Sequence, residues 1–337
     1  MSAMANLKWL AMLTIFFGAY CGCTETMTTP KTLDPTSDTL DVSTWNIGYA
    51  GLGAESDFLK DGGERILPPS RSAVKKNVRG ILNELGKKQS DVILLQEIAS
   101  RSAMTRFVGV ERRLHNLFAD RFYWFHPDTR VPFLPPPVGI AHGLGIVSDK
   151  TVKRRSIHAL PKEDDYAFGW LDRDYALQII ELESQGPVHW VVINMHLAAF
   201  DSDGAVRKSQ AKVAFDIADA YHRDGRHVVI GGDWNMELAI ADTPRPTTEE
   251  YPFWLVPFDE TLLPQGWKLA VDRRNPTVRT LIAPYRPGET YTAIIDGFAY
   301  SPNVVLEEIE TEDTSFEMAD HMPVKARFRA SMDRPIP

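Results

Sequence analysis

The chain has 337 residues, of which 44% are hydrophobic and 24% charged. This composition supplies ample apolar material for a folded core and excludes intrinsic disorder over most of the length. The formal net charge of −8 argues against a broad, non-specific affinity for nucleic acid, because clustered Lys and Arg residues hold phosphate backbones. A polyanionic substrate would therefore need a local positive site or a bound cation.

The first residues predict an export signal. Lys8 precedes an apolar run over residues 9–20, which has the length of a signal-peptide core and is short for a membrane span. Both cysteines of the chain, Cys21 and Cys23, lie at the end of this run. A domain that follows them therefore contains no internal disulfide.

The sequence Gly22-Cys23-Thr24 is typical of the site where a bacterial lipoprotein is cleaved and acylated. Tyr20 and Cys21 depart from this pattern, because small aliphatic residues are usual there, and plain secretion is the alternative. We expect a lipoprotein signal over 1–23 and an exported protein anchored in a bacterial envelope membrane through Cys23. Residues 24–38 are polar and rich in Pro and Thr, which predicts a flexible tether.

One domain is expected over residues 39–331, where short apolar runs alternate with segments of helical period, as in layered α/β proteins. The predicted strands are, in chain order, 40–46, 91–98, 122–126, 143–148, 175–183, 188–196, 227–233, 292–301, 303–310 and 323–330. Four prolines exclude a central strand over 131–139, which we expect to be a loop. About ten strands favour two packed sheets over one open sheet.

Two helices are predicted between these strands. The first begins near Ser70 or Ser72, and its apolar face carries Val74, Val78, Ile81, Leu82 and Leu85. The second is traced by the spacing of Val206, Gln210, Val213, Ile217 and Tyr221, with Gly225 at its C-terminal cap. The expected arrangement is therefore two sheets with helices on the outside.

Polar side chains follow four of the predicted strands at the point where each strand ends. They are Asn46, Glu97, the pair Asn194 and His196, and the pair Asp233 and Asn235. Open α/β sheets place ligand sites at the carboxyl ends of their strands, so we expect one shared site. Taken singly, each residue also has an ordinary explanation as a cap, a turn residue or an ion-pair partner.

Three further candidates come late in the chain: Asp296, Asp320 and His321. The whole set combines carboxylates, amides and two imidazoles and contains no thiol. Carboxylate and amide oxygens suit a hard cation such as Mg²⁺ or Mn²⁺, whereas a zinc site would need more nitrogen or sulfur ligands.

These motifs, in this order, resemble those of the endonuclease/exonuclease/phosphatase superfamily, which includes DNase I-like nucleases, abasic-site endonucleases, neutral sphingomyelinases and inositol-polyphosphate phosphatases. The matching motifs are Trp45-Asn46, Gln96-Glu97, Asn194-Met195-His196, Gly232-Asp233-Trp234-Asn235, Ile295-Asp296 and Asp320-His321-Met322-Pro323. The resemblance implies a four-layer α-β-β-α sandwich of two mixed sheets flanked by helices. One motif alone is weak evidence, whereas six in the right order are specific.

The resemblance also implies roles for the matched residues. Glu97 is the expected principal metal ligand, with Asn46 and Asp320 close to the cation. His321, oriented by Asp296, is expected to act as general base on water. The remaining residues, expected to contact the phosphate, help the leaving group and stabilise the transition state, are Asp233, Asn235, Asn194 and His196. This chain has Ala319 where the family usually has Ser before the final Asp-His pair.

Three other features have open interpretations. Arg173 is a candidate phosphate ligand or, equally, a surface ion-pair partner of Asp172 or Asp174. His142 is a candidate substrate-loop residue, although a turn is the commoner role. The Gly-rich insertion over 47–63 is placed where a loop could line the mouth of the site, and its alternative is a surface loop that uses Gly for tight turns.

The predicted function is therefore metal-dependent hydrolysis of phosphate esters outside the cytoplasm. Three substrate classes fit: extracellular nucleic acid, a phospholipid or sphingolipid headgroup, and a sugar or inositol phosphate. A sphingomyelinase-like lipid phosphodiesterase is the first alternative activity, and a non-catalytic surface lipoprotein that uses the fold for binding is the second. No feature of the sequence predicts a protein partner.

Overall fold

The computed structural model describes residues 38–130, 141–162, 173–199, 201 and 203–331, which all belong to one compact unit, Asp34–Pro337. The predicted signal segment with Cys23, the loop at 131–139 and all but the last residue of the 24–38 tether lie outside the described residues. Among the helices in the described ranges, none is long and apolar enough to cross a membrane.

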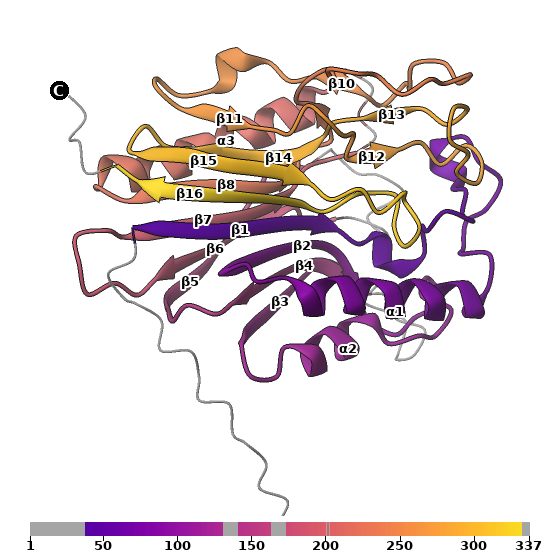
Figure 1. Cartoon of the computed structure of the whole chain (residues 1–337), viewed down its shortest axis with the longest axis horizontal. Helices are drawn as coiled ribbons and strands as arrows, with labels where there is room; N and C mark the ends of the chain where they lie inside the picture. Colours follow the sequence, from indigo (N-terminus) through magenta and orange to yellow (C-terminus); the bar gives the residue numbers. More distant parts are fainter. Residues whose placement is uncertain (1–37, 131–140, 163–172, 200, 202, 332–337) are drawn as a thin grey trace, which may run out of the picture. The chain divides into compact units, whose positions relative to one another are not determined.

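Two six-stranded mixed sheets form the centre of this unit (Figure 1). The first sheet contains β1 (Thr39–Asn46), β2 (Val92–Ala99), β3 (Phe122–Arg130), β4 (Ala141–Ser148), β15 (Val304–Thr311) and β16 (Val324–Ala330), in the order β15-β16-β1-β2-β4-β3. The second contains β5 (Val152–Ala159), β6 (Ala176–Leu182), β7 (Trp190–His196), β8 (His227–Asp233), β11 (Lys268–Ala270) and β14 (Asp296–Tyr300), in the order β11-β14-β8-β7-β6-β5. Each sheet has one parallel pair, β1 with β2 and β7 with β8.

The helices cover the outer faces of the sheets, which completes the predicted four-layer α-β-β-α sandwich. Helices α1 (Arg71–Lys87) and α2 (Val110–Leu117) pack on the first sheet, and α3 (Ala205–Arg223) packs on the second (Figure 1). Ser70 caps α1, because its Oγ accepts a hydrogen bond from Ala73 N at 3.1 Å. The helix therefore begins after the first of the two predicted serines.

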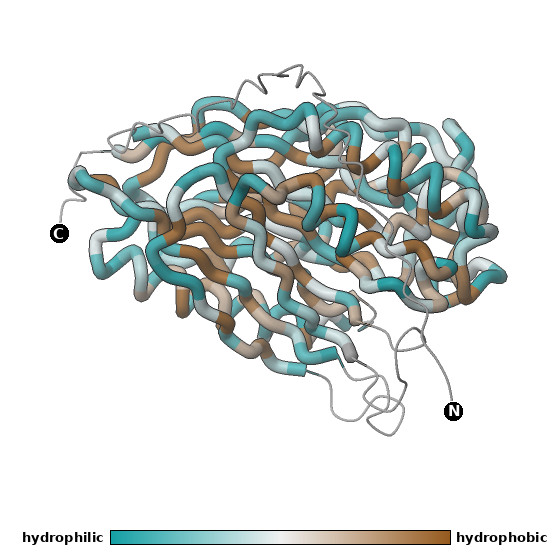
Figure 2. Tube along the Cα trace, turned by 90° about the horizontal axis from the view of Figure 1, so that it is seen from below, coloured by the Kyte–Doolittle hydropathy of each residue, from teal (hydrophilic) through white to brown (hydrophobic). Residues whose placement is uncertain are grey.

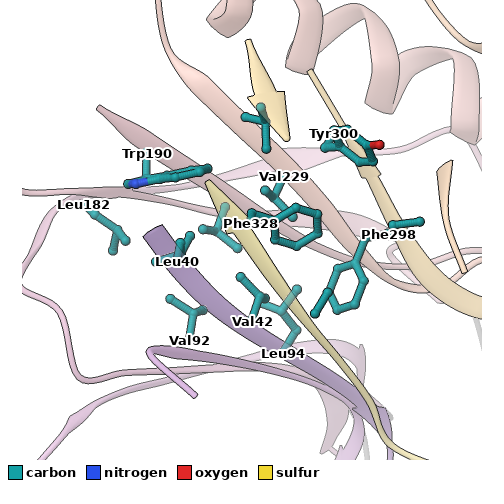
Figure 3. Close-up of a cluster of buried hydrophobic side chains, with 14 of the residues drawn as sticks. Leu40, Val42, Val92, Leu94, Leu182, Trp190, Val229, Phe298, Tyr300 and Phe328 are labelled. Carbon is teal, nitrogen blue, oxygen red and sulfur yellow. The ribbon is translucent and has the colours of Figure 1, made fainter. Parts of the chain in front are cut away.

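The main core lies between the two sheets, where β-branched and aromatic side chains from both inner faces meet. Figure 3 shows Leu40, Val42 and Leu94 of the first sheet with Val229 and Phe298 of the second. In Figure 2 the hydrophobic segments, in brown, are concentrated in the middle of the unit, and hydrophilic segments, in teal, lie mostly around them. Burial of apolar area of this kind is the main stabilising contribution to such a fold.

Four elements differ from the predictions. The strand β5 was missed because its side chains alternate poorly and are largely exposed, and α2 because it buries only Val110 and Leu114. The predicted strand 292–301 is two strands, β13 (Thr292–Ala293) and β14. On α3 the predicted Gln210 is buried and Val213, Ile217 and Tyr221 pack partly buried on the core, but the most buried side chains also include Arg207, Ala211, Ala214, Phe215 and Ala218.

Short strands and turns join these elements. They are η1 (Gly48–Ala50), η2 (Leu59–Asp61), β9 (Met236–Glu237), β10 (Val256–Pro257), η4 (Glu260–Leu262) and β12 (Val278–Arg279). The β12 strand pairs with β13 and also forms an isolated bridge from Val278 to His321. This bridge ties the segment before β16 to β12.

Candidate functional site

The strand pairing brings the predicted site residues to one edge of the two sheets. In the parallel pair of the second sheet, His196 lies opposite Asp233, and Asp233 lies opposite Asp296 on the other side. In the first sheet, Asn46 lies opposite Gln96, the residue before Glu97. A pocket of about 200 Å³ opens at this edge, and its polar lining includes Asn46, Glu97, His142, His196, Asp233, Asn235, Asp320 and His321, together with Lys60, Asp61 and Arg279.

His321 is held in the pocket by a buried carboxylate. Its Nδ1 lies 2.8 Å from Asp296 Oδ2, and the indole of Trp45 donates to the His321 carbonyl at 3.0 Å. Because Nδ1 faces the carboxylate, Nε2 is the ring atom directed to the pocket. Burial opposes the charged form, but Asp296 and Asp233 outweigh it and hold the pKa of His321 well above its ordinary value.

Asp233 occupies the centre of the polar floor. One oxygen accepts from Asn46 Nδ2 at 2.9 Å, and the other accepts from the Asn235 backbone at 2.9 Å. Its Oδ2 also lies 3.3 Å from His196 Nε2 and 3.7 Å from His321 Nε2. Burial and the nearby Asp296 raise the pKa of Asp233 to about 7, although His321 lowers it.

Asn235 stands in a left-handed conformation, with φ of 50°, at the turn that follows β8. Its side chain donates to the Leu197 carbonyl at 2.9 Å, and its own carbonyl accepts from the buried Arg207 of α3. Arg207 was not singled out from the sequence, because this residue lies outside the predicted helical spacing and belongs to no motif. This guanidinium fixes the turn that carries Asp233 and Asn235.

At Nδ1, His196 contacts an arginine, whereas His321 contacts a carboxylate at the same ring atom. Arg173 Nη2 lies 2.7 Å from His196 Nδ1, and an arginine can only donate, so Nδ1 carries no proton and Nε2 carries one. Burial and Arg173 hold the pKa of His196 well below its ordinary value. The neutral ring therefore presents an N–H donor at Nε2, toward the pocket.

Arg173 is not in the surface ion pair that was the alternative reading. Its Nε and Nη2 donate to Asp128 Oδ2 at 3.0 and 2.9 Å, and both side chains are largely buried. Asp174 instead pairs with Lys162 at 3.3 Å. Arg173 is absent from the pocket lining, so its described contacts support His196 rather than a direct phosphate contact.

His142 is a strand residue of β4 and lines the pocket, which corrects the expectation of a turn. Its Nε2 lies 3.7 Å from Glu97 and its Nδ1 lies 3.6 Å from Asp128. Burial opposes its charge, but these two carboxylates raise the pKa of His142 to about 9. The imidazolium thus links Glu97 to the Asp128 and Arg173 pair.

Asn194 does not reach the pocket, which corrects its predicted catalytic role. Its amide nitrogen donates to the carbonyls of Leu95 and Gly145 at 3.1 and 3.0 Å, and its oxygen accepts from Gln96 Nε2 at 2.7 Å. The side chain is fully buried and its hydrogen bonds are used between the two sheets. Asn194 therefore ties the sheets together beneath the site.

The residues predicted to hold a cation fit a divalent ion. Asp320 Oδ1 is buried and has no hydrogen-bond partner among the described residues. Burial and Glu97 raise the pKa of Asp320 to about 7, as expected for clustered carboxylates without a counter-ion. A Cβ at Gly48 would lie 2.6 Å from that oxygen, so the glycine leaves space beside it. Oxygen donors from Glu97, Asn46 and Asp320 are the type that Mg²⁺ prefers.

A second group of possible ligand atoms lies close by, on Asp233, Asp296 and His321, within 4.8 Å of one another. Asp296 and His321 already satisfy each other through their hydrogen bond. A cation between them would break that bond, so the Glu97 side of the pocket fits an ion better.

The Gly-rich insertion lines the pocket, as the sequence suggested. Tyr49 of η1 is buried over the site in a left-handed conformation, with φ of 41°, and its ring meets His142 edge-on at 6.3 Å. Burial and the carboxylate of Glu97 raise the pKa of its phenol. Arg279 anchors the base of the insertion by donating to the carbonyls of Gly53 and Ser56 at 2.8 and 3.2 Å.

Solved structures with the same fold come from distant relatives. An endonuclease/exonuclease/phosphatase protein from Beutenbergia cavernae superposes with a TM-score of 0.57 at 19% identity, covering 87% of this chain and 72% of that one. TDP2 from Caenorhabditis elegans gives 0.54 at 15% identity, with 87% and 74% covered. ANGEL2, described as a 2′,3′-cyclic phosphatase, gives 0.55 at 15% identity, with 87% and 96% covered. These likenesses establish the fold.

No curated protein matches the sequence. The sequence model of the endonuclease/exonuclease/phosphatase family matches residues 43–287, which is most of the chain and includes the strands that carry Asn46, Glu97, His196 and Asp233. The chain therefore belongs to the endonuclease/exonuclease/phosphatase family, whose members are phosphoester hydrolases.

Proposed function

We propose that this protein hydrolyses phosphate esters with a divalent cation, Mg²⁺ or Mn²⁺, and that it does so outside the cytoplasm. The observation that carries the proposal is the pairing, in one pocket, of a carboxylate-oriented imidazole with a cluster of buried carboxylates. Such a pair activates water, and such a cluster attracts a cation.

His321 is the proposed general base. Asp296 accepts from Nδ1, so Nε2 faces the pocket and is available to take a proton from water. Asp296 and Asp233 raise the pKa of His321, which strengthens its imidazole as a base but also favours its charged form. A divalent cation held beside Asp320 would offset this negative charge and favour the neutral imidazole, which can accept a proton at Nε2.

The cation is proposed to be held by Glu97, Asn46 and Asp320. When bound, it supplies positive charge that polarises the phosphoryl group and balances the charge of the transition state. The protein itself adds the N–H donor of His196, which is directed to the pocket by the Arg173 contact at Nδ1.

Asp233 and Asn235 are proposed to act on the leaving group. The pKa of Asp233 is raised to about 7, so this carboxyl carries a proton for part of the time near neutral pH. A carboxyl of this kind can protonate a departing alkoxide, as general acids with perturbed pKa values do. Asn235, fixed by Arg207 and Leu197, keeps its turn in place beside Asp233.

The substrate and the location are also proposals. The relatives named above include TDP2 and a 2′,3′-cyclic phosphatase, which supports phosphodiester or phosphomonoester substrates. Nucleic acid, a lipid headgroup and a sugar or inositol phosphate remain the three candidates. The Gly22-Cys23-Thr24 sequence supports export and acylation at Cys23.

The proposal is tested by incubating the full chain, purified in detergent, with plasmid DNA, sphingomyelin-type lipid or inositol phosphates. We expect turnover of one class with Mg²⁺ or Mn²⁺, none with EDTA, and a loss of about 10²-fold or more in Glu97→Gln. Glu307→Gln, which changes an exposed glutamate of β15 that pairs with Arg329, is the matched control and should keep full activity. Equal activity of Glu97→Gln and the control would refute the mechanism.

A further inference from the structure

The pocket has an apolar wall that the proposed chemistry does not use. Besides the carboxylates and histidines, its lining includes Leu52, Phe58, Met104, Trp254 and Leu281, together with Lys60, Asp61 and Arg279. Leu52 and Leu281 belong to one buried apolar cluster, and Phe58 and Met104 pack against it while remaining only partly buried. Apolar side chains thus line a pocket whose floor carries several carboxylates.

The wall is built around the Gly-rich insertion and its neighbours, and a buried carboxylate holds it together. Asp61 of η2 accepts from the backbone N–H of Leu281 and from the indole N–H of Trp254. Phe58 N also donates to the Leu281 carbonyl at 2.8 Å. Asp61 therefore fixes three segments that are distant in sequence, and the position of Phe58 in the wall follows from these contacts.

Glycine is required at one point of this assembly. A Cβ at Gly63 would lie 2.7 Å from both the Leu281 carbonyl oxygen and the Phe58 backbone nitrogen. The backbone of the insertion can therefore approach residue 281 closely only without a side chain at residue 63. This close approach brings Phe58 and Leu281 together on one side of the pocket.

We propose that this wall is a binding subsite for an apolar group, an aryl ring or an alkyl chain, on the organic part of the phosphate ester. The inference rests on the proposed function, since the floor must hold the phosphate. Hydroxyl-rich groups such as inositol would leave polar atoms unpaired against Phe58 and Met104, whereas an apolar group would lose only water there. The subsite therefore selects esters that carry an apolar group next to the phosphate.

Binding of simple phosphonates tests the subsite without any turnover. Methylphosphonate, benzylphosphonate and hexylphosphonate share the same anionic group, and calorimetry with the full chain in Mg²⁺ measures their Kd values. We expect benzylphosphonate or hexylphosphonate to bind at least about tenfold more tightly than methylphosphonate, the lower range for an apolar pocket contact. Whichever of the two gains more identifies the group as aryl or alkyl.

Two variants localise the effect. Phe58→Ala and Met104→Ala change side chains of the wall on separate segments, and each should reduce the gain over methylphosphonate several-fold. Ile66→Ala is the matched control, because Ile66 follows the same insertion but is 69% exposed and does not line the pocket. Its preference for the apolar phosphonates should equal that of the unmodified protein.

The outcomes separate this inference from the proposed function. If no ester is hydrolysed but the apolar phosphonates bind more tightly in a way that needs Phe58, the catalytic proposal fails and the subsite stands. If methylphosphonate, benzylphosphonate and hexylphosphonate bind equally, or none binds, the subsite is refuted whatever the enzyme hydrolyses.

Discussion

Two histidines of the pocket approach the same carboxylate oxygen, but the group at Nδ1 is negative for one and positive for the other. His321 Nε2 lies 3.7 Å from Asp233 Oδ2, and His196 Nε2 lies 3.3 Å from the same atom. Behind His321, a carboxylate lies 2.8 Å from Nδ1, whereas a guanidinium lies 2.7 Å from Nδ1 of His196. The pKa of His321 is therefore raised and that of His196 lowered.

This difference shows that the group bound at Nδ1 decides what a pocket histidine can do. With a carboxylate at Nδ1, the ring can gain a proton at Nε2, which suits a general base. With an arginine at Nδ1, the ring stays neutral and can only donate from Nε2, which suits a fixed hydrogen-bond donor. The two roles follow from neighbours that are remote in sequence.

The largest expected effect comes from removing the base or the group that orients it. His321→Ala should lower kcat by about 10²–10⁴-fold, because the activation of water is lost. Asp296→Asn should cause a loss of similar order, and the double variant should be no worse than His321→Ala, since the two residues act as a unit. Steady-state kinetics of all three variants measure this.

His158→Ala is the control for these variants, because His158 lies on the exposed strand β5 and should not affect kcat. Multiplicative losses in the double variant would show that Asp296 acts independently of His321. The assignment of His321 as a general base oriented by Asp296 would then be wrong.

Much of the fold was predictable from the sequence, because buried strands are short, apolar and bounded by polar residues. The runs around Val42, Ile93 and Ile230 became central strands, and the count of strands indicated two sheets. The pairing of parallel strands then explains why Asn46, Glu97, His196 and Asp233 converge. Edge strand β5 could not be predicted, since an exposed strand carries no apolar alternation.

The half of the site around His196 could not be predicted in the same way. Asp128 lies within β3 and Arg173 lies before β6, and neither residue is part of a motif quoted for the family resemblance. Asn194 is the reverse case. It is part of a motif and was predicted to be catalytic, but its amide forms hydrogen bonds between the two sheets. Contacts between residues distant in sequence decide both cases.

The second largest effect is expected from breaking the ion pair between Arg173 and Asp128, which lies next to His196. Arg173→Met leaves Asp128 buried without its guanidinium, so the free energy of unfolding should fall by about 3–5 kcal/mol. The imidazole of His196 should also titrate closer to its ordinary range, because a positive neighbour is removed. Urea unfolding and NMR titration of His196 measure the two effects.

Adding Asp128→Asn to Arg173→Met should recover part of the lost stability, because the unpaired charge is then removed as well. Wild-type stability in Arg173→Met would mean that water or His142 satisfies Asp128, and an unchanged titration of His196 would mean that Arg173 does not set its protonation.

The smallest expected effect is on the pH dependence of the free energy of unfolding, measured in EDTA. It compares the two histidines directly. For His196 the pKa is lowered on folding, so below about pH 6.5 the unfolded chain binds a proton that the native state does not. Its contribution to stability is therefore present above pH 6.5 and is lost as the pH falls. For His321 the pKa is raised, so its contribution is present below pH 6.5 and is lost as the pH rises.

The contribution of each histidine is obtained by subtracting the unfolding free energy of its variant from that of the wild type. The unfolding free energy of wild type minus that of His196→Gln should increase with pH below about 6.5, and the same difference for His321→Gln should decrease with pH above about 6.5. Each slope is at most about 1.4 kcal/mol per pH unit, the limit for one proton. If the two free-energy differences change with pH in the same direction, the two histidines do not have opposite environments. If they change in opposite directions and the His321 slope becomes flatter when Mg²⁺ is added, the cation acts on the His321 side of the pocket.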